Sequence, residues 1–199
     1  MLRLLTIPAL ALLSATPVAA CPTELGPGIV VVSDDGGVSR ITPTDRPGLL
    51  HERVTFDDGY GFEILSFHGI YIVGQVDFGS EGMIEDSRET AEFAQTPPPP
   101  EAGQRLQGIM AQVVRDGRTE SRRHDIEVGQ PETMQIGDCG YRALPVTLDT
   151  FDEHGPGRTW MAWLPDLEVA LFVGYADRDG EERYTILSIE AHDPATSAP

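Results

Sequence analysis

The sequence predicts a mainly β fold, in which antiparallel meanders form a curved sheet, a half-barrel or a sandwich with at most one or two short helices. Two patterns support this prediction. Short runs of apolar residues alternate with polar ones at a period of two, as in half-buried strands. Turn dipeptides such as Asp-Gly separate the runs at short intervals, which is typical of hairpins. We expect about ten or eleven strands in total.

Two strands are expected within residues 28–41, around an Asp-Gly turn, and three more within residues 49–78, where two Gly-containing turns interrupt the apolar runs. The last of these strands alternates clearly between apolar and polar residues. Its apolar face is expected to comprise four residues: Ile70, Ile72, Val76 and Phe78.

Residues 80–94 break this alternation. Asp86 with Glu89 resembles a helix-start signal, so one short helix is expected here. Four consecutive prolines then form a stiff, extended stretch that cannot continue a helix. We interpret residues 96–104 as a surface connector between two blocks of strands.

The second block begins with a hairpin expected within residues 106–126. Four further strands are expected at 141–149, 158–164, 168–176 and 182–191. Four aromatic residues gather in this last meander: Trp160, Trp163, Phe172 and Tyr175. Packing in the core is the favoured interpretation of these rings, and the lining of a groove is the alternative.

Residues 1–20 have the pattern of a secretory signal peptide. Arg3 is their only charge, and a short apolar run is followed by small residues. The run is shorter than the roughly 20 residues that a bilayer span requires. We therefore predict a protein of the periplasm or the secreted fraction. Residues 21–193 are expected to form a single β-rich domain, and residues 194–199 a flexible tail.

Cys21 has two competing interpretations. The sequence Val-Ala-Ala-Cys that ends at this residue resembles the lipobox of bacterial lipoproteins, which predicts lipidation of Cys21 and an anchor in the membrane. The chain has two cysteines, however, and an even number in an exported protein favours a disulfide. The favoured hypothesis is therefore a disulfide between Cys21 and Cys139.

The charge balance narrows the range of partners. All 14 basic residues are arginines, and 32 acidic residues give a formal net charge of −18. Nucleic-acid phosphates require a basic surface, so nucleic acid is not expected as a partner. Contact with a membrane is expected only if Cys21 is lipidated. The partner is therefore expected to be an unknown small molecule or an envelope protein.

One basic island interrupts the acidic sequence, formed by Arg115, Arg118, Arg122 and Arg123. On a strand, Arg118 and Arg122 would share a face, with Arg123 on the opposite one. A functional interpretation makes Arg118 and Arg122 contacts for an anionic ligand. The favoured interpretation is an edge strand protected from aggregation by its charges.

No catalytic, cofactor-binding or metal-binding residue is assigned. The five histidines are scattered, and no motif of a serine or thiol enzyme is present. Two acidic turns, at 149–154 and 177–182, offer carboxylates of the kind that Ca²⁺ prefers. Neither turn has the spacing of an EF-hand, and a chain this acidic is expected to contain such clusters.

Two segments resemble known classes of protein. The stretch GQPETMQIGDCGYRALPVTLDTF, residues 129–151, is similar to the exported lipoprotein-carrier proteins, which have a β half-barrel fold. The stretch ACPTELGPGIVVV, residues 20–32, resembles uncharacterised secreted proteins of proteobacteria. These resemblances imply a fold and an exported location, and they transfer no catalytic residue.

The main functional hypothesis is an exported periplasmic protein that is not an enzyme and acts as a binding or scaffold protein. The first alternative is an envelope lipoprotein, lipidated at Cys21, that handles apolar ligands, as the half-barrel resemblance implies. The second alternative is a hydrolase whose site assembles only in three dimensions. A buried cleft that brings a histidine and a carboxylate within hydrogen-bond reach would identify it.

Overall fold

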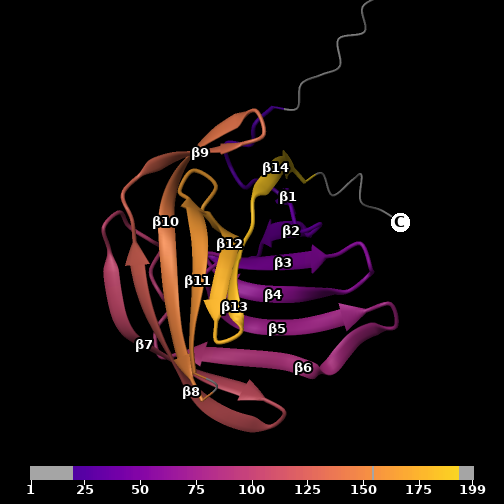
Figure 1. Ribbon diagram of the computed structural model, residues 1–199, viewed down its shortest axis with the longest axis vertical. Coiled ribbons are helices and arrows are strands. Elements are labelled where there is room, and N and C mark those ends of the chain that lie inside the picture. Colours follow the sequence, from indigo (N-terminus) through magenta and orange to yellow (C-terminus); the bar gives the residue numbers. More distant parts are fainter. Residues whose placement is uncertain (1–19, 154, 193–199) are drawn as a thin grey trace, which may run out of the picture.

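The computed structural model describes residues 20–153 and 155–192 (Figure 1). These residues form fourteen strands and no helix, in one curved antiparallel sheet that does not close. The predicted fold class is therefore confirmed. The sequence underestimated the number of strands. The predicted signal peptide, apart from Ala20, and the predicted tail lie outside the described residues.

The strands of the first half are β1 (Ile29–Ser33), β2 (Val38–Pro43), β3 (Leu49–Thr55), β4 (Gly61–Phe67), β5 (Tyr71–Gly79), β6 (Gly82–Phe93) and β7 (Arg105–Arg115). Those of the second half are β8 (Arg118–Val128), β9 (Glu132–Ile136), β10 (Cys139–Asp152), β11 (Gly155–Leu164), β12 (Val169–Asp177), β13 (Gly180–Arg183) and β14 (Ile186–Ala191). No helix long and apolar enough to cross a membrane occurs in the described part of the chain.

The strand order is β13-β12-β11-β10-β8-β7-β6-β5-β4-β3-β2-β1-β14, and β9 pairs with β10 outside this path. Neighbours along the chain are mostly neighbours in the sheet, as expected for meanders. The exceptions are β14, which pairs with β1, and β8, which pairs with β10. In Figure 1, β3 to β6 run across the picture while β10 to β12 run almost vertically, so the sheet curls until its two halves face each other.

The expected apolar face of β5 is wrong in part because of a β-bulge. The register between β4 and β5 shifts at Leu65 and Ser66. As a result, Ile72 and Gln75 line the same cavity although they are three residues apart. Phe78 instead packs beneath the guanidinium group of Arg53, 4.1 Å from Cζ to the ring centre. The bulge therefore separates Ile72 and Phe78, which strict alternation would place together.

The expected helix within residues 80–94 is also wrong, because this segment contains strand β6. Its backbone pairs with β5 on one side and with β7 on the other. The hydroxyl of Ser87 accepts a hydrogen bond from the backbone N–H of Asp77 and donates one to the carbonyl of Ile84. Pairing on both sides outweighs the local helix signal of Asp86 and Glu89.

The strand pairing contradicts the edge-strand interpretation of the basic island only in part. β8, which carries Arg118, Arg122 and Arg123, lies between β7 and β10. Its pairing with β10 covers residues 123–128, so Arg123 does not lie on a free edge, whereas residues 118–122 pair with β7 alone. The segment 96–104, expected to be a connector, lies between the end of β6 and the start of β7.

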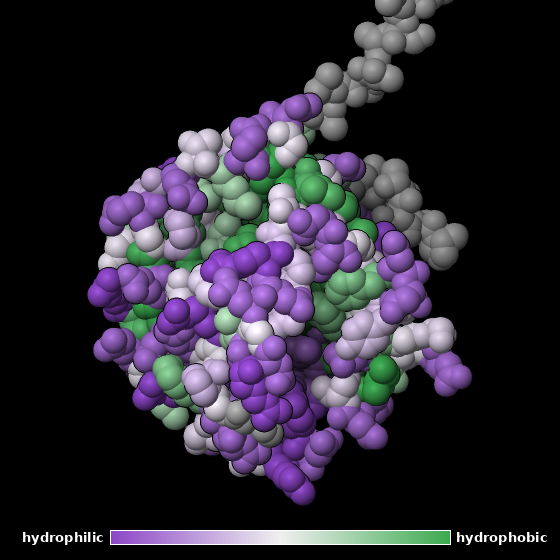
Figure 2. Space-filling model, in the orientation of Figure 1, coloured by the Kyte–Doolittle hydropathy of each residue, from purple (hydrophilic) through white to green (hydrophobic). Residues whose placement is uncertain are grey.

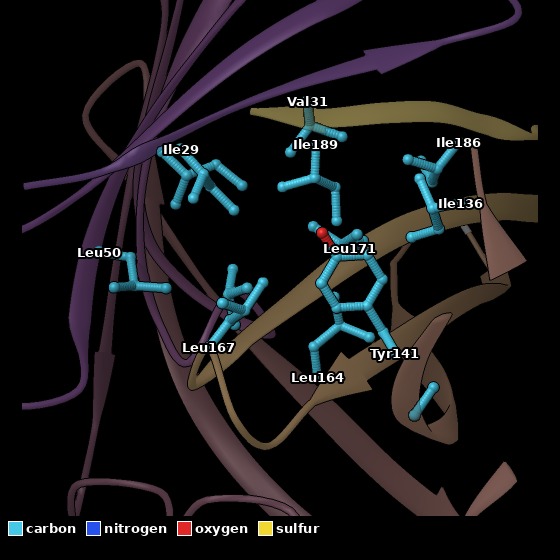
Figure 3. Close-up of a cluster of buried hydrophobic side chains, with 13 residues drawn as sticks. Ile29, Val31, Leu50, Ile136, Tyr141, Leu164, Leu167, Leu171, Ile186 and Ile189 are labelled. Carbon is cyan, nitrogen blue, oxygen red and sulfur yellow. The ribbon is translucent and has the colours of Figure 1, made fainter. Parts of the chain in front are cut away.

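Two clusters of buried apolar side chains form the core. The first, shown in Figure 3, gathers residues from β1, β3, β9, β10, β12 and β14, including Ile29, Leu171 and Ile189. The hydroxyl of Tyr141 lies within this cluster and is buried without a hydrogen-bond partner in the described structure. The second cluster includes Trp163 and is built mainly from β4, β5, β8, β10 and β11.

Cys21 and Cys139 form a disulfide, as the favoured hypothesis expected, with 5.7 Å between their Cα atoms. The bond joins the start of the described chain to the first residue of β10. It spans 118 residues of sequence, a loop for which chain entropy in the unfolded state gives a stabilisation of about 5 kcal/mol. A disulfide indicates an exported or envelope location, because cytosolic thiols are kept reduced.

Candidate functional site

An apolar cavity of about 400 Å³ lies between the two facing halves of the sheet. Strands β1 to β5 supply one wall, and β10, β11, β12 and β14 supply residues of the other. This volume is at the lower end of the range found for small-molecule sites, about 300–1,000 Å³. Representative apolar lining residues are Ile41, Val54, Phe62, Ile64, Ile72 and Met161.

The alternation of β3 places one carboxyl group on the wall of this cavity. Leu50, Glu52 and Val54 point inward, and the residues between them point outward. On the outer face, the neighbouring Arg53 pairs with Glu63 of β4. Glu52 therefore faces an apolar interior, and no arginine or histidine is among the described residues that line the cavity.

Burial raises the pKa of the Glu52 carboxyl above its ordinary value. A hydrogen bond with the Ser39 side chain and the charge of His51 act in the opposite direction, but they do not compensate for burial. The protonated form is thus favoured compared with that of an exposed glutamate. The cavity wall carries a polar group that can donate as well as accept a hydrogen bond.

Three aromatic rings complete the lining on the side of β12 and β13. The Phe172 ring lies 6.4 Å from that of Tyr175 and 5.6 Å from that of Tyr184, measured between ring centres. Phe172 is 46% exposed, which is unusual for a phenylalanine that contacts a cavity. Asp35 also lines the cavity and accepts hydrogen bonds from the Ser33 hydroxyl and the Gly37 N–H.

The two interpretations of the aromatic residues, packing in the core and lining a groove, each apply to some of them. Trp163 is buried in the second core cluster. Phe172 and Tyr175 line the apolar cavity. Trp160 lines a separate, shallower groove, and the guanidinium group of Arg183 lies over its ring.

The basic island contributes to a charged cluster, which we define as Glu89, Arg115, Glu120, Arg122 and Asp152. Glu89 is only 5% exposed. It accepts hydrogen bonds from Arg115 at 2.5 Å and from Arg122 at 2.6 Å. Arg122 also donates to Glu120 at 3.0 Å, and its Nε lies 3.5 Å from a carboxylate oxygen of Asp152.

The two arginines proposed as anion contacts thus have different surroundings in the structure. Arg122 is surrounded by carboxylates, whereas Arg118 is exposed at the start of β8. Arg123 lies over the ring of Phe151, 4.0 Å from Cζ to the ring centre. An anion-binding role for Arg118 and Arg122 stays a prediction.

His124 lies beside the charged cluster on β8. Its Nδ1 is 3.3 Å from the hydroxyl of Thr150, with the donor set by the tautomer. Burial, followed by the charge of Arg122, lowers the pKa of His124 to about 4. A histidine with this pKa is neutral at ordinary pH.

The hydrolase alternative required a histidine and a carboxylate together in a cleft. Among the described residues, neither the apolar cavity nor the shallower groove has a histidine in its lining. His51 lies 3.5 Å from Glu63 on the outer face. His68 packs edge-on against Trp163. His154 lies outside the described residues.

Both acidic turns proposed for Ca²⁺ contribute to that shallower groove, whose volume is about 650 Å³. Its acidic members are Asp149, Asp152, Asp177, Asp179 and Glu181. Asp149 accepts two hydrogen bonds from Arg158. No group of three histidine, cysteine or acidic side chains arranged for a metal ion occurs in the described parts of the chain. Calcium binding by these turns stays the disfavoured alternative that the sequence left open.

Sequence reasoning missed Glu52 and the surroundings of Glu89. A signal for Glu52 is present in the sequence LLHERVT, where an acid occupies the inward position between Leu50 and Val54. For Glu89 no local signal exists, because its partners Arg115 and Arg122 come from other strands.

The sequence matches no family model and no curated protein. A solved structure with a related shape is the hypothetical lipoprotein YmcC from Escherichia coli (K12). The match has 8% sequence identity and a TM-score of 0.40, and it covers 81% of this chain and 87% of the other. At this level the likeness carries no argument about function.

Proposed function

We propose that the protein is an exported, non-enzymatic binding protein that holds an apolar small molecule between the two halves of its sheet. The apolar cavity of about 400 Å³ is the observation that carries this proposal. Interiors normally pack with few voids larger than a water molecule, so a space of this size calls for an occupant.

The composition of the lining supports a binding role. Most lining residues are apolar, and a few polar groups, including Glu52 and Gln75, interrupt them. Ligand sites generally combine apolar walls with a few polar groups that fix the orientation of the ligand. Half-buried side chains such as Phe62, Ile64 and Ile72 keep accessible surface that a ligand would cover.

The periplasm is the proposed location, because it is an oxidising compartment in which the Cys21–Cys139 disulfide is stable. The disulfide and a lipid anchor exclude each other, since both require the sulfur of Cys21. We therefore place the soluble form ahead of the lipoprotein alternative. The surface facing the viewer in Figure 2 is mostly hydrophilic, with separate hydrophobic areas.

The test uses N-phenyl-1-naphthylamine, an uncharged fluorophore whose emission rises in apolar surroundings. The wild-type protein is expected to give a saturable rise in emission. Ile72→Trp, which places a larger side chain in the cavity, is expected to abolish the rise. Leu187→Trp is the matched control, because Leu187 is 50% exposed and does not belong to the lining.

Circular dichroism and thermal unfolding establish that both variants are folded. Absence of a saturable signal with the wild-type protein would overturn the proposal. Equal binding by Ile72→Trp and Leu187→Trp would do the same, because the fluorophore would then occupy another surface.

A further inference from the structure

The ionisable groups that line the apolar cavity have one property in common. They are Asp35, Glu52, Tyr175 and Tyr184, and each is neutral or negative in its accessible protonation states. No arginine and no histidine lines the cavity in the described part of the structure. The whole chain carries a formal charge of −18, so the surrounding field has the same sign.

We propose that the apolar cavity selects apolar ligands that carry a positively charged ammonium group, in preference to equally apolar alcohols and carboxylates. The inference deepens the proposed function and rests on it. A binding protein for apolar compounds in general would have no need of this charge pattern.

The aromatic rings supply the first argument. The ring centre of Phe172 lies 6.4 Å from that of Tyr175 and 5.6 Å from that of Tyr184, and Phe172 is 46% exposed. Aromatic faces attract cations through the ring quadrupole, and groups of such rings recognise quaternary ammonium ligands. An ammonium group at this side of the cavity would cover rings that are otherwise left in contact with solvent.

Glu52 supplies the second argument. Its nearest cation in the sequence, Arg53, points to the outer face, where it pairs with Glu63 and covers the ring of Phe78. The carboxyl of Glu52 therefore has no arginine partner inside the cavity, among the residues that the structure describes. A ligand ammonium group would provide the missing counter-charge, and burial raises the pKa of Glu52 in the absence of such a charge.

The same arrangement disfavours an anionic ligand. A carboxylate buried beside Glu52 and Asp35 would lose its hydration and gain no positive partner. An alcohol hydroxyl would donate a hydrogen bond to Glu52 or accept one from its protonated form. It would gain only apolar contact from the aromatic rings. The expected order of affinity is therefore ammonium, then alcohol, then carboxylate.

The experiment compares three compounds with the same chain: dodecyltrimethylammonium, dodecanol and dodecanoate. Each is titrated into the full-length exported protein below its micelle concentration or, for dodecanol, its solubility limit, with displacement of N-phenyl-1-naphthylamine as the readout. We expect the ammonium compound to bind about tenfold more tightly than the alcohol, in line with the strength of cation–π and ion contacts. Dodecanoate is expected to bind most weakly.

The outcomes separate the two proposals. Equal binding of all three compounds, or tightest binding of dodecanoate, overturns the selectivity and leaves the proposed function intact. Failure of all three to bind overturns both. Tightest binding of the ammonium compound supports both.

Variants test the residues. Glu52→Gln keeps the shape of the side chain and is expected to reduce affinity for the ammonium compound about tenfold, with dodecanol changed by less than about twofold. Phe172→Leu is expected to reduce it about threefold through loss of the cation–π contact. Glu63→Gln is the matched control on the outer face. An equal loss in Glu52→Gln and Glu63→Gln would show that net charge alone determines affinity, and it would overturn the role of Glu52.

Discussion

Two glutamates on the inner side of the sheet have opposite surroundings. Glu52 lies on an apolar wall without an arginine partner among the described lining residues, and burial raises its pKa. Glu89 is 5% exposed and accepts hydrogen bonds from both Arg115 and Arg122. The difference teaches that an inward-facing acid stabilises this sheet only where neighbouring strands supply its counter-charge. Where they do not, the carboxyl group remains available to a ligand.

The largest expected effect comes from breaking the paired site. Glu89→Gln leaves Arg122 without its main partner, and it should lower the free energy of unfolding by about 3–5 kcal/mol, as is typical for a broken buried ion pair. Urea unfolding at pH 7.5 measures this loss. Glu92→Gln, an exposed change on the same strand, serves as the control and should stay within about 0.5 kcal/mol of wild type. A loss below about 1 kcal/mol for Glu89→Gln would mean that water solvates the cluster.

The free energy of unfolding should depend on pH through His124, which lies beside the charged cluster. Its pKa is lowered from the usual 6.5 to about 4, so the unfolded chain binds the proton first as the pH falls. Stability is therefore lost between pH 6.5 and about 4, by about 3 kcal/mol in total. His124→Asn should remove this slope. Unfolding free energies of both proteins at several pH values measure it, and parallel curves would contradict the assignment.

Glu52, in the apolar cavity, should change the free energy of unfolding with pH in the opposite direction. Because the pKa of Glu52 is raised above 4.5, the folded protein keeps its proton when the unfolded chain has lost it. Stability therefore falls as the pH rises above about 4.5. Glu52→Leu should remove this loss and stabilise the ligand-free protein by about 1–2 kcal/mol at pH 7.5, since it removes a buried polar group. A destabilised variant would show that the hydrogen bond between Glu52 and Ser39 outweighs the cost of burying the carboxyl.

The smallest effect concerns a buried hydroxyl without a partner. Tyr141 is 8% exposed, and its hydroxyl has no hydrogen-bond partner in the described structure. Tyr141→Phe should be neutral or stabilising by up to about 1 kcal/mol, because it removes a desolvated polar atom. Thermal unfolding measures the change, with Tyr60→Phe at an exposed position as the control. A clear loss of stability would show that the hydroxyl is satisfied.

The sequence predicts the fold class well because period-two alternation and Asp-Gly turns are local signals. It also favours the Cys21–Cys139 disulfide, since two cysteines in an exported chain leave one pairing. The strand β6 was mistaken for a helix, because its partners β5 and β7 determine its conformation. The face of Ile72 is only partly predictable, since the bulge beside it in β5 depends on the register with β4.

The candidate site was less predictable than the fold. Glu52 is visible as an inward acid only when the strand and its direction are known. The cavity depends on the distance between halves of the sheet that are far apart in sequence, and no local pattern records that distance. The groups around Glu89 likewise come from separate strands.

The pairing of the first described strand with the last limits the order in which the sheet can form. Ile29 of β1 lies opposite Ala191 of β14, and the residues between them must be made before that pair can form. Throughout this time β1, with the sequence IVVVS, has one unpaired apolar edge of the kind that joins to other chains. Contacts of such long sequence separation also form slowly. The sheet is therefore completed late in folding, and β1 is open to contact with other chains until β14 pairs with it.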